Sequence, residues 1–203
     1  MEDGTSYSAE FTQLINDPEN VRKLIEGSFV TGVSFEEWKK ERSPIVQAIN
    51  KDGTILDIGC ANGFLLRCLQ AWSPHKLDPY GIDIEGDRIN EAKELFKTEP
   101  NHFVKASIRQ LDYLENGGLP DQYDFVYWNV WDNKDFNDQL EIDWLEATLR
   151  RVKPDGRLIL GFYDSDKTKN VDRVDRLIEL GYKISSQDIN DLETKEIFIW
   201  IDR

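Results

Sequence analysis

Short apolar runs alternate with segments of helical period from residue 54 to the end of the chain, and this alternation limits the possible folds most strongly. We predict strands at residues 54–58, 80–83, 102–106, 123–128 and 157–163. Helical stripes lie between them, at residues 64–72, 89–96, 140–152 and 171–178. Strands that alternate with helices favour a parallel sheet with helices on both faces.

The last two predicted strands, residues 182–186 and 196–201, are connected in a different way. The polar stretch 187–195 joins them and is too short for a crossover helix, so we expect antiparallel neighbours. The fold class that follows is α/β, a doubly wound and mostly parallel seven-stranded sheet whose last strand is antiparallel.

The first fifty residues have the pattern of short helices. Ser34 and Glu37 form a capping box that begins one helix, and Ser43-Pro44 has the form of a second helix start. We therefore expect an N-terminal helical segment, residues 1–50, packed on residues 51–203 within a single compact unit.

Acidic residues outnumber basic ones by 39 to 25, and the net charge is −14. Phosphate backbones attract clustered Lys and Arg, so this balance predicts that neither nucleic acid nor an anionic membrane is a partner. The longest apolar runs, residues 158–162 and 197–201, are far shorter than the about 20 residues of a membrane span. The acidic start and the two cysteines predict a cytoplasmic protein. With two histidines, a multi-histidine metal site is excluded, and we expect no metal.

The turn after the first predicted strand reads Asp-Ile-Gly-Cys-Ala-Asn-Gly, residues 57–63. Gly59 allows a sharp turn, and the small Ala61 allows a ligand to approach the backbone closely. Gly63 lets the next helix begin close to the sheet, with its free N–H groups facing the ligand. The glycines alone are equally typical of an ordinary strand-to-helix turn.

Two carboxylates favour a ligand site over an ordinary turn. Asp57 ends the first strand, where it would repel a pyrophosphate and attract an ammonium or sulfonium group. Asp83 ends the second strand, 20 residues after Gly63, where a carboxylate accepts hydrogen bonds from ribose hydroxyls. The alternative for Asp83 is a solvated acid at a strand end.

Four segments resemble motifs of the class I S-adenosylmethionine-dependent methyltransferases, in the order and spacing of that family. They are residues 55–63, 81–84, 123–126 and 152–158. The resemblance covers residues 43–203 and implies a Rossmann-like sheet in which strand seven lies between strands five and six. It also implies S-adenosyl-L-methionine as the cofactor.

The resemblance assigns cofactor contacts to ten residues: Asp57, Gly59, Cys60, Ala61, Gly63, Asp83, Ile84, Ser107, Ile108 and Asn129. Asp57 would lie near the methionine ammonium and the turn backbone along the methionine portion. Asp83 would bind the ribose, and Ile84 would pack on the adenine. Ser107 stands where the family often has an acid, so Ile108 and the backbone would contact the adenine. Asn129 would face the methionine end or the acceptor.

Two departures from the family pattern are visible. Asn129 is followed by Val130 and Trp131, so the Asn/Asp-Pro-Pro-aromatic signature of methylases acting on planar amide or base nitrogens is absent. Ala61 replaces a glycine, which we expect to be mild if its backbone angle is ordinary.

Methyl transfer from a sulfonium is an in-line displacement in which the protein mainly positions the acceptor and excludes water. The candidate catalytic residues are Asp132, Tyr163 and Asp164, which otherwise read as ordinary loop residues. Trp128 and Trp131 are candidate walls of an acceptor pocket, with core packing favoured for Trp128.

Residues 1–50 would form a lid over the cofactor. The residues to examine there are Tyr7, Trp38 and Arg42, and Arg42 is a candidate partner of the methionine carboxylate.

The leading hypothesis is a soluble methyltransferase that acts on a small molecule. The alternatives are a protein or peptide methyltransferase, a cofactor-binding scaffold without turnover, and a nicotinamide-dependent oxidoreductase. Asp57 and the lack of a Gly-x-Gly-x-x-Gly run count against the last. The pattern names neither the acceptor nor the oligomeric state.

Overall fold

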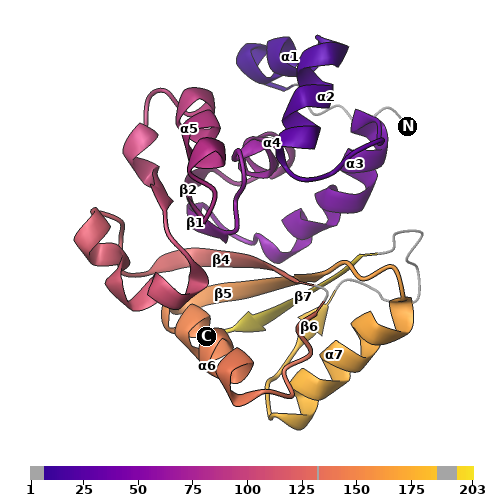
Figure 1. Ribbon diagram of the computed structural model, residues 1–203, viewed down its shortest axis with the longest axis vertical. Helices are drawn as coiled ribbons and strands as arrows, with labels where there is room; N and C mark the ends of the chain where they lie inside the picture. Colours follow the sequence, from indigo (N-terminus) through magenta and orange to yellow (C-terminus); the bar gives the residue numbers. More distant parts are fainter. Residues whose placement is uncertain (1–6, 132, 187–195) are drawn as a thin grey trace.

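The computed structural model describes residues 7–131, 133–186 and 196–203 (Figure 1). Seven strands form one sheet in the order β3-β2-β1-β4-β5-β7-β6, which confirms the predicted fold class. Their bounds are β1 Gly53–Ile58, β2 Leu77–Asp83, β3 Phe103–Lys105, β4 Tyr123–Val130, β5 Val152–Phe162, β6 Ser185–Ser186 and β7 Ile197–Asp202.

The pairing of the strands places a crevice at the middle of the sheet. β1 pairs in parallel with both β2 and β4, and β4 pairs in parallel with β5. β7 is antiparallel to both β5 and β6, as predicted. Strand order therefore reverses between β1 and β4, and in open sheets ligands bind beyond the carboxyl ends of the strands at such a point.

Helices cover both faces of the sheet (Figure 1). The helices α4 (Phe64–Trp72) and α5 (Gly86–Leu95) lie on one face, where they share a core with Ile55 and Phe125. The other face carries η3 (Ile108–Gly117), α6 (Gln139–Arg150) and α7 (Lys167–Glu179), packed on Leu56 and Val126. The alternation of side chains along β1 and β4 therefore separates two apolar cores.

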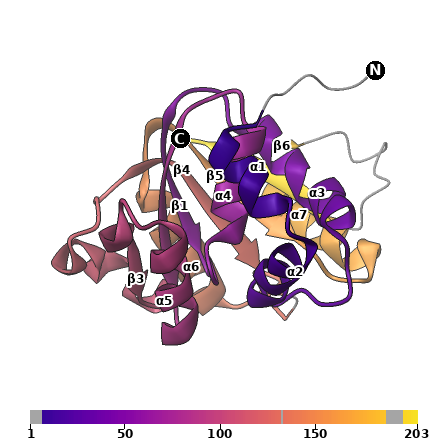
Figure 2. The same ribbon diagram turned by 90° about the horizontal axis from the view of Figure 1, so that it is seen from above.

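The N-terminal segment forms α1 (Ala9–Ile15), α2 (Pro18–Gly27), α3 (Phe35–Arg42) and the 3₁₀ helix η1 (Ser43–Ala48). They lie on the same side of the sheet as α4 and α5 (Figure 2). The capping box of Ser34 and Glu37 is confirmed. A second helix begins at Ser43-Pro44 as predicted, but it is the 3₁₀ helix η1 and its N-cap residue is Arg42 rather than Ser43.

Within the described ranges, no helix combines the length and the apolar character that crossing a membrane requires.

Candidate functional site

A cavity of about 210 Å³, which we call the Gly59 cleft, lies at the carboxyl ends of β1, β2 and β3. Five of the ten predicted cofactor residues line it: Gly59, Asp83, Ile84, Ser107 and Ile108. Three segments that are far apart in the sequence therefore meet at one edge of the sheet, where the parallel topology places a ligand.

The turn after β1 leaves its backbone open to the cleft. Gly59 has a φ of +83°, and a Cβ built on it would meet no atom within 4 Å, so a side chain there would occupy the space of a ligand. Gly63 also has a positive φ, +74°, and caps α4. The Cys60 side chain is buried beneath Gly81 and does not line the cleft.

Asp83 organises the turn as well as facing the cleft. Its Oδ2 accepts the N–H of Ala61 at 2.9 Å, and its Oδ1 accepts the N–H of Glu85 at 2.8 Å. A carboxylate has about four acceptor positions, so two remain for hydroxyl donors. The residues around the Gly59 cleft therefore fit an adenosine, with Asp83 for the ribose and the exposed Ile84 for the base.

Ala61 does not have the ordinary backbone angle that we assumed, because its φ is +48°. The left-handed region costs an L-residue about 1 kcal/mol relative to glycine. The N–H bond to Asp83 holds Ala61 in that conformation. Here the expectation from the sequence is corrected, because only the folded turn sets this angle.

We expect Ala61→Gly to stabilise the protein by about 0.5 kcal/mol, because glycine removes about 1 kcal/mol of Cβ strain and returns about half of this as entropy of the unfolded chain. The melting temperature should rise by about 1–2 °C, with little change in cofactor affinity. A lower melting temperature in thermal unfolding would contradict the assignment of strain to this residue.

Asp57 is buried, at 2% exposed, and faces the N-terminal helices. In the described part of the chain no hydrogen bond or ion pair reaches its carboxylate. Burial, with a smaller contribution from Asp83, raises the pKa of Asp57 to about 8, although Arg42 acts in the opposite direction. The carboxylate therefore favours an incoming cation, as the methionine ammonium or the sulfonium would supply.

Asn129 lies two residues beyond Tyr127, a register partner of Asp57, and is itself paired with Gly161 of β5. Its Oδ1 is buried and accepts no hydrogen bond from the described residues. Asn129 does not line the Gly59 cleft, yet it presents an open acceptor at the carboxyl end of β4.

A second cavity of about 410 Å³, which we call the Glu196 pocket, lies at the carboxyl end of β5 and the start of β7. The lining residues come from the N-terminal segment and from the chain that follows β5 and precedes β7. They are Val30, Val33, Glu37, Trp38, Glu41, Arg42, Tyr163, Ser165 and Glu196. Arg42 donates to Glu196 Oε2 at 2.6 Å, and its role toward a methionine carboxylate stays a prediction. Burial raises the pKa of Glu196 to about 7, against the lowering effect of Arg42.

The candidate catalytic residues separate in the structure. Tyr163 lines the Glu196 pocket, whereas Asp164 lies near Lys169 and Arg173 of α7, at 3.5 and 3.4 Å. Successive residues at the end of a strand point to opposite faces, which explains the difference. Asp132 lies outside the described residues.

Of the two tryptophans predicted to wall an acceptor pocket, one lines a cavity and the other lies in the core. Trp131 is 39% exposed and lines the Gly59 cleft. Trp128 is buried against Phe136 in the core, as favoured from the sequence.

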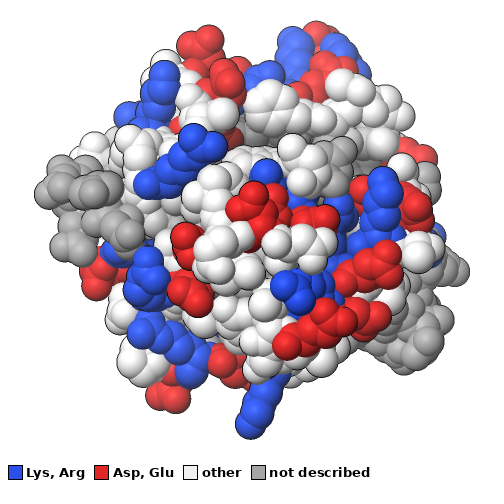
Figure 3. Space-filling view, turned by 60° about the horizontal axis from the view of Figure 1, so that its bottom comes forward, with Lys and Arg blue, Asp and Glu red and all other residues white. Residues whose placement is uncertain are grey.

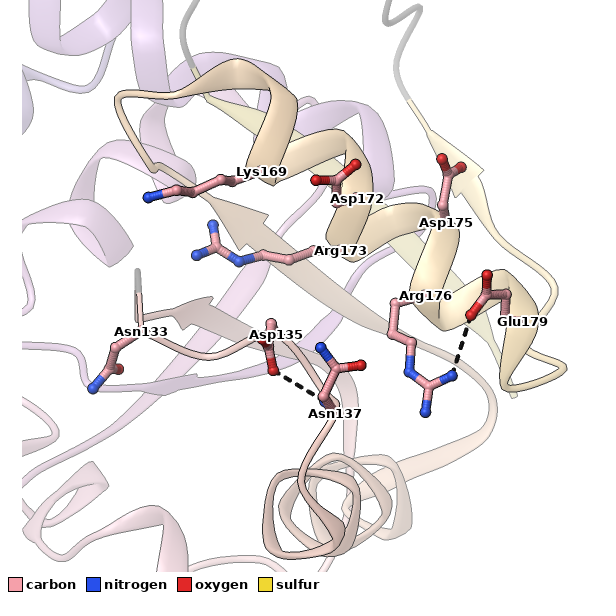
Figure 4. A pocket seen from close by; sticks show the side chains of 9 residues that line it. All are labelled: Asn133, Asp135, Asn137, Lys169, Asp172, Arg173, Asp175, Arg176 and Glu179. Carbon is pink, nitrogen blue, oxygen red and sulfur yellow. Dashed lines mark hydrogen bonds and ion pairs between the residues drawn. The ribbon is translucent and has the colours of Figure 1, made fainter.

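A third hollow, of about 610 Å³, lies between α7 and the loop that follows β4 (Figure 4). Lys169 and Arg173 extend from α7 into it, facing Asn133 and Asp135. Arg173 donates to the carbonyl of Lys134 at 2.7 Å, so it also ties the helix to the loop. None of the predicted site residues that the structure describes lines this hollow, and we do not assign the reaction to it.

Two residues at or near the β1 turn were missed from the sequence. Phe29 has a φ of +61°, is 63% exposed and lines the Gly59 cleft from the N-terminal segment. Asn62 joins the turn to that segment, because its Oδ1 accepts from Ser28 Oγ at 2.9 Å and its Nδ2 donates to the carbonyl of Leu24 at 2.9 Å. The polar Asn62 within an apolar turn was the available signal.

We expect Gly27→Ala to detach the N-terminal segment from the turn, because a Cβ on Gly27 would overlap the Asn62 amide. Loss of the Asn62 hydrogen bonds should cost about 2 kcal/mol and lower the melting temperature by about 4–8 °C. S-adenosylhomocysteine should bind several-fold more weakly in calorimetry. Gly86→Ala is the control, since its Cβ would first meet Lys105 Cδ at an ordinary 3.5 Å; equal effects of both changes would refute the connection.

Comparison with known proteins matches residues 32–190 to the family described as "Methyltransferase domain". The fold is similar to that of a putative caffeoyl-CoA O-methyltransferase from Staphylococcus aureus, with a TM-score of 0.57 and 19% identity over 96% of each chain. The fibrillarin pre-rRNA processing protein of Methanococcus jannaschii has a TM-score of 0.57 and 15% identity, over 81% of this chain and 75% of that chain. The DhpI–SAH complex has a TM-score of 0.56 and 15% identity, over 94% and 96%. No curated protein matches the sequence.

Proposed function

Because the chain belongs to the methyltransferase domain family, whose members use S-adenosylmethionine, we propose that it transfers a methyl group to a small molecule bound in the Glu196 pocket. The observation that carries the proposal is the position of the two cavities. They lie on either side of the end of β4, one lined by the predicted cofactor residues and the other by Tyr163.

The Gly59 cleft is the proposed cofactor site. Asp83 would hold the ribose hydroxyls, Ile84 and Ile108 would flank the adenine, and the open backbone of Gly59 would lie along the methionine portion. Cys60, Ala61 and Gly63 would support the turn from behind rather than line the cleft, and Asp57 would act on the cofactor through its charge.

The acceptor side supports a small molecule. A volume of about 410 Å³ is in the range of small-ligand pockets. On the face shown in Figure 3, acidic and basic side chains are interspersed, with no continuous basic surface of the kind that nucleic acid needs. With a net charge of −14, this supports a small-molecule acceptor over RNA.

The bound cofactor supplies an electrophilic methyl group on sulfur, and this chain's residues position the partners. Asp57 places a negative charge beneath the methionine end, and Asn129 offers an acceptor at the end of β4. Phe29 and Trp131 cover the Gly59 cleft from two elements, which would exclude water from the reacting atoms. The N-terminal segment would thus act as the lid.

Calorimetry of the full chain with S-adenosylmethionine, S-adenosylhomocysteine and NAD tests the cofactor assignment, and a mass shift of one methyl group in a metabolite extract tests transfer. We expect both adenosyl compounds to bind and NAD not to bind. Binding of NAD alone would overturn the proposal. Cofactor binding with no methyl release to any acceptor pool would favour a scaffold, and methylation of added peptides alone would favour a peptide methyltransferase.

A further inference from the structure

The charges that line the Glu196 pocket select against anionic acceptors. Three carboxylates, of Glu37, Glu41 and Glu196, face one guanidinium, of Arg42. Glu37 already accepts from Ser34 in the capping box, at 2.7 Å. The pocket therefore carries an excess of negative charge on its walls, as does the molecule as a whole.

The single cation of the pocket is committed to a protein partner. Arg42 and Glu196 form an ion pair at 2.6 Å, with side-chain exposures of 9% and 13%. A carboxylate or phosphate acceptor would have to draw Arg42 away and leave Glu196 buried without its partner, which is strongly unfavourable. Acceptors that carry phosphate or carboxylate groups near the reacting atom are thus excluded by charge.

Two buried acceptors near the ends of β1 and β4 have no described partner, whereas Trp38 Nε1, in the wall of the Glu196 pocket, is a donor without one. Asn129 Oδ1 is buried and receives no hydrogen bond from the described residues, and no described group bonds the buried Asp57 carboxylate. With three carboxylates and one committed guanidinium on the walls, a positively charged ligand fits this pocket better than an anionic one. The apolar walls, Val30, Val33 and Trp38, fit a hydrocarbon or aromatic body.

On the basis of the proposed function, we propose that the methyl acceptor is a small amine that enters the Glu196 pocket as an ammonium ion, attracted by the carboxylates of its walls, and releases its proton to solvent water before it reacts. The freed nitrogen lone pair then forms the C–N bond to the methyl carbon while the C–S bond breaks, and the bonding pair stays on sulfur. The product is a methylated ammonium and a neutral thioether.

The test is direct binding, which does not depend on turnover. The full chain is saturated with S-adenosylhomocysteine and titrated, under observation by NMR, with three probes of one shape: 2-phenylethylamine, 2-phenylethanol and 3-phenylpropionate. We expect the amine to bind at least 10-fold more tightly than the alcohol, and the carboxylate not to bind. A carboxylate that binds as tightly as the amine, or an amine no tighter than the alcohol, would overturn the inference.

Variants assign the preference to the pocket. Glu196→Gln keeps an oxygen for Arg42 and should remove at least 10-fold of the preference for the amine over the alcohol, whereas Glu94→Gln, 81% exposed on α5, should remove none. If Glu196→Gln does not fold, Glu41→Gln, half-buried at the same pocket, should lower the preference about 2–5-fold. An undiminished preference in the folded variant would refute the role of the pocket. Failure of S-adenosylhomocysteine to bind would instead refute the proposed function.

Discussion

Asp83→Asn should weaken the binding of S-adenosylhomocysteine by about 100-fold or more. The Asp83 carboxylate accepts the N–H groups of Ala61 and Glu85 and, in our proposal, two ribose hydroxyls. An amide has one acceptor oxygen, so its NH₂ group would face two of these donors, one backbone N–H of the turn and one ribose hydroxyl. Hydrogen bonds to a charged group contribute about 1.5–3 kcal/mol each, and the loss of two accounts for the predicted change.

The same substitution should also lower the melting temperature, because one buried N–H of the turn loses its partner. Asp87→Asn is the matched control, since Asp87 is exposed in the first turn of α5. Calorimetry and thermal unfolding measure the two effects. An unchanged dissociation constant in a folded Asp83→Asn variant would remove Asp83 from the cofactor site.

Asp57→Asn should make the unliganded protein more stable and its binding of S-adenosylmethionine weaker. The carboxyl group is buried without a bonded partner in the described structure and must take up a proton when the chain folds, so an amide, which needs no proton to be neutral, removes that cost. The cofactor then loses the counter-charge of its cationic end, and we expect about 10–30-fold weaker binding. A gain in stability together with a loss of binding is expected where a residue that lowers the stability of the free protein is needed to bind the ligand.

The stabilisation by Asp57→Asn should depend on pH in a definite direction. The folded pKa of Asp57, about 8, lies above the ordinary value of 3.8, so the folded state holds the proton that the unfolded state has lost. Wild-type stability therefore falls as the pH rises from about 4 to 8, and the asparagine variant escapes this loss. Its advantage should be at least about 2 kcal/mol larger at pH 8 than at pH 5, or about 4–8 °C in melting temperature.

Thermal unfolding at several pH values checks this prediction, with the exposed Asp172→Asn as the control. Calorimetry in buffers of different ionisation enthalpy should also show that S-adenosylmethionine binding at pH 7 releases close to one proton from the wild type and less from Asp57→Asn. An advantage of Asp57→Asn that does not change with pH would show that Asp57 is ionised before the ligand arrives.

Apolar periodicity and turn residues determined much of the fold by themselves. The helix predicted at 64–72 is α4, and the strand predicted at 54–58 is β1 less its first residue. β5 begins five residues earlier than predicted, at Val152, because the chain resumes pairing with Tyr123 before its bend at Asp155 and Gly156. η3 was not predicted, since a 3₁₀ helix has no strong periodic signature.

The sequence also predicted that the cofactor residues lie at one edge of the sheet, because the carboxyl ends of parallel strands lie at the same edge. The sequence did not predict which of those side chains point toward the ligand. Gly59 and Asp83 line the cleft, whereas Cys60 points into the core and Asp83 also holds the Ala61 amide.

Only the tertiary structure decided what lies opposite each buried charge. Arg42 and Glu196 are 154 residues apart in the chain, and nothing local to either predicts their ion pair. The positive φ of Ala61 and the bond from Ser28 to Asn62 likewise depend on residues that arrive from distant elements. Periodicity reports which neighbours share a face, whereas electrostatics and backbone strain depend on the particular atoms that folding places within a few ångströms of each other.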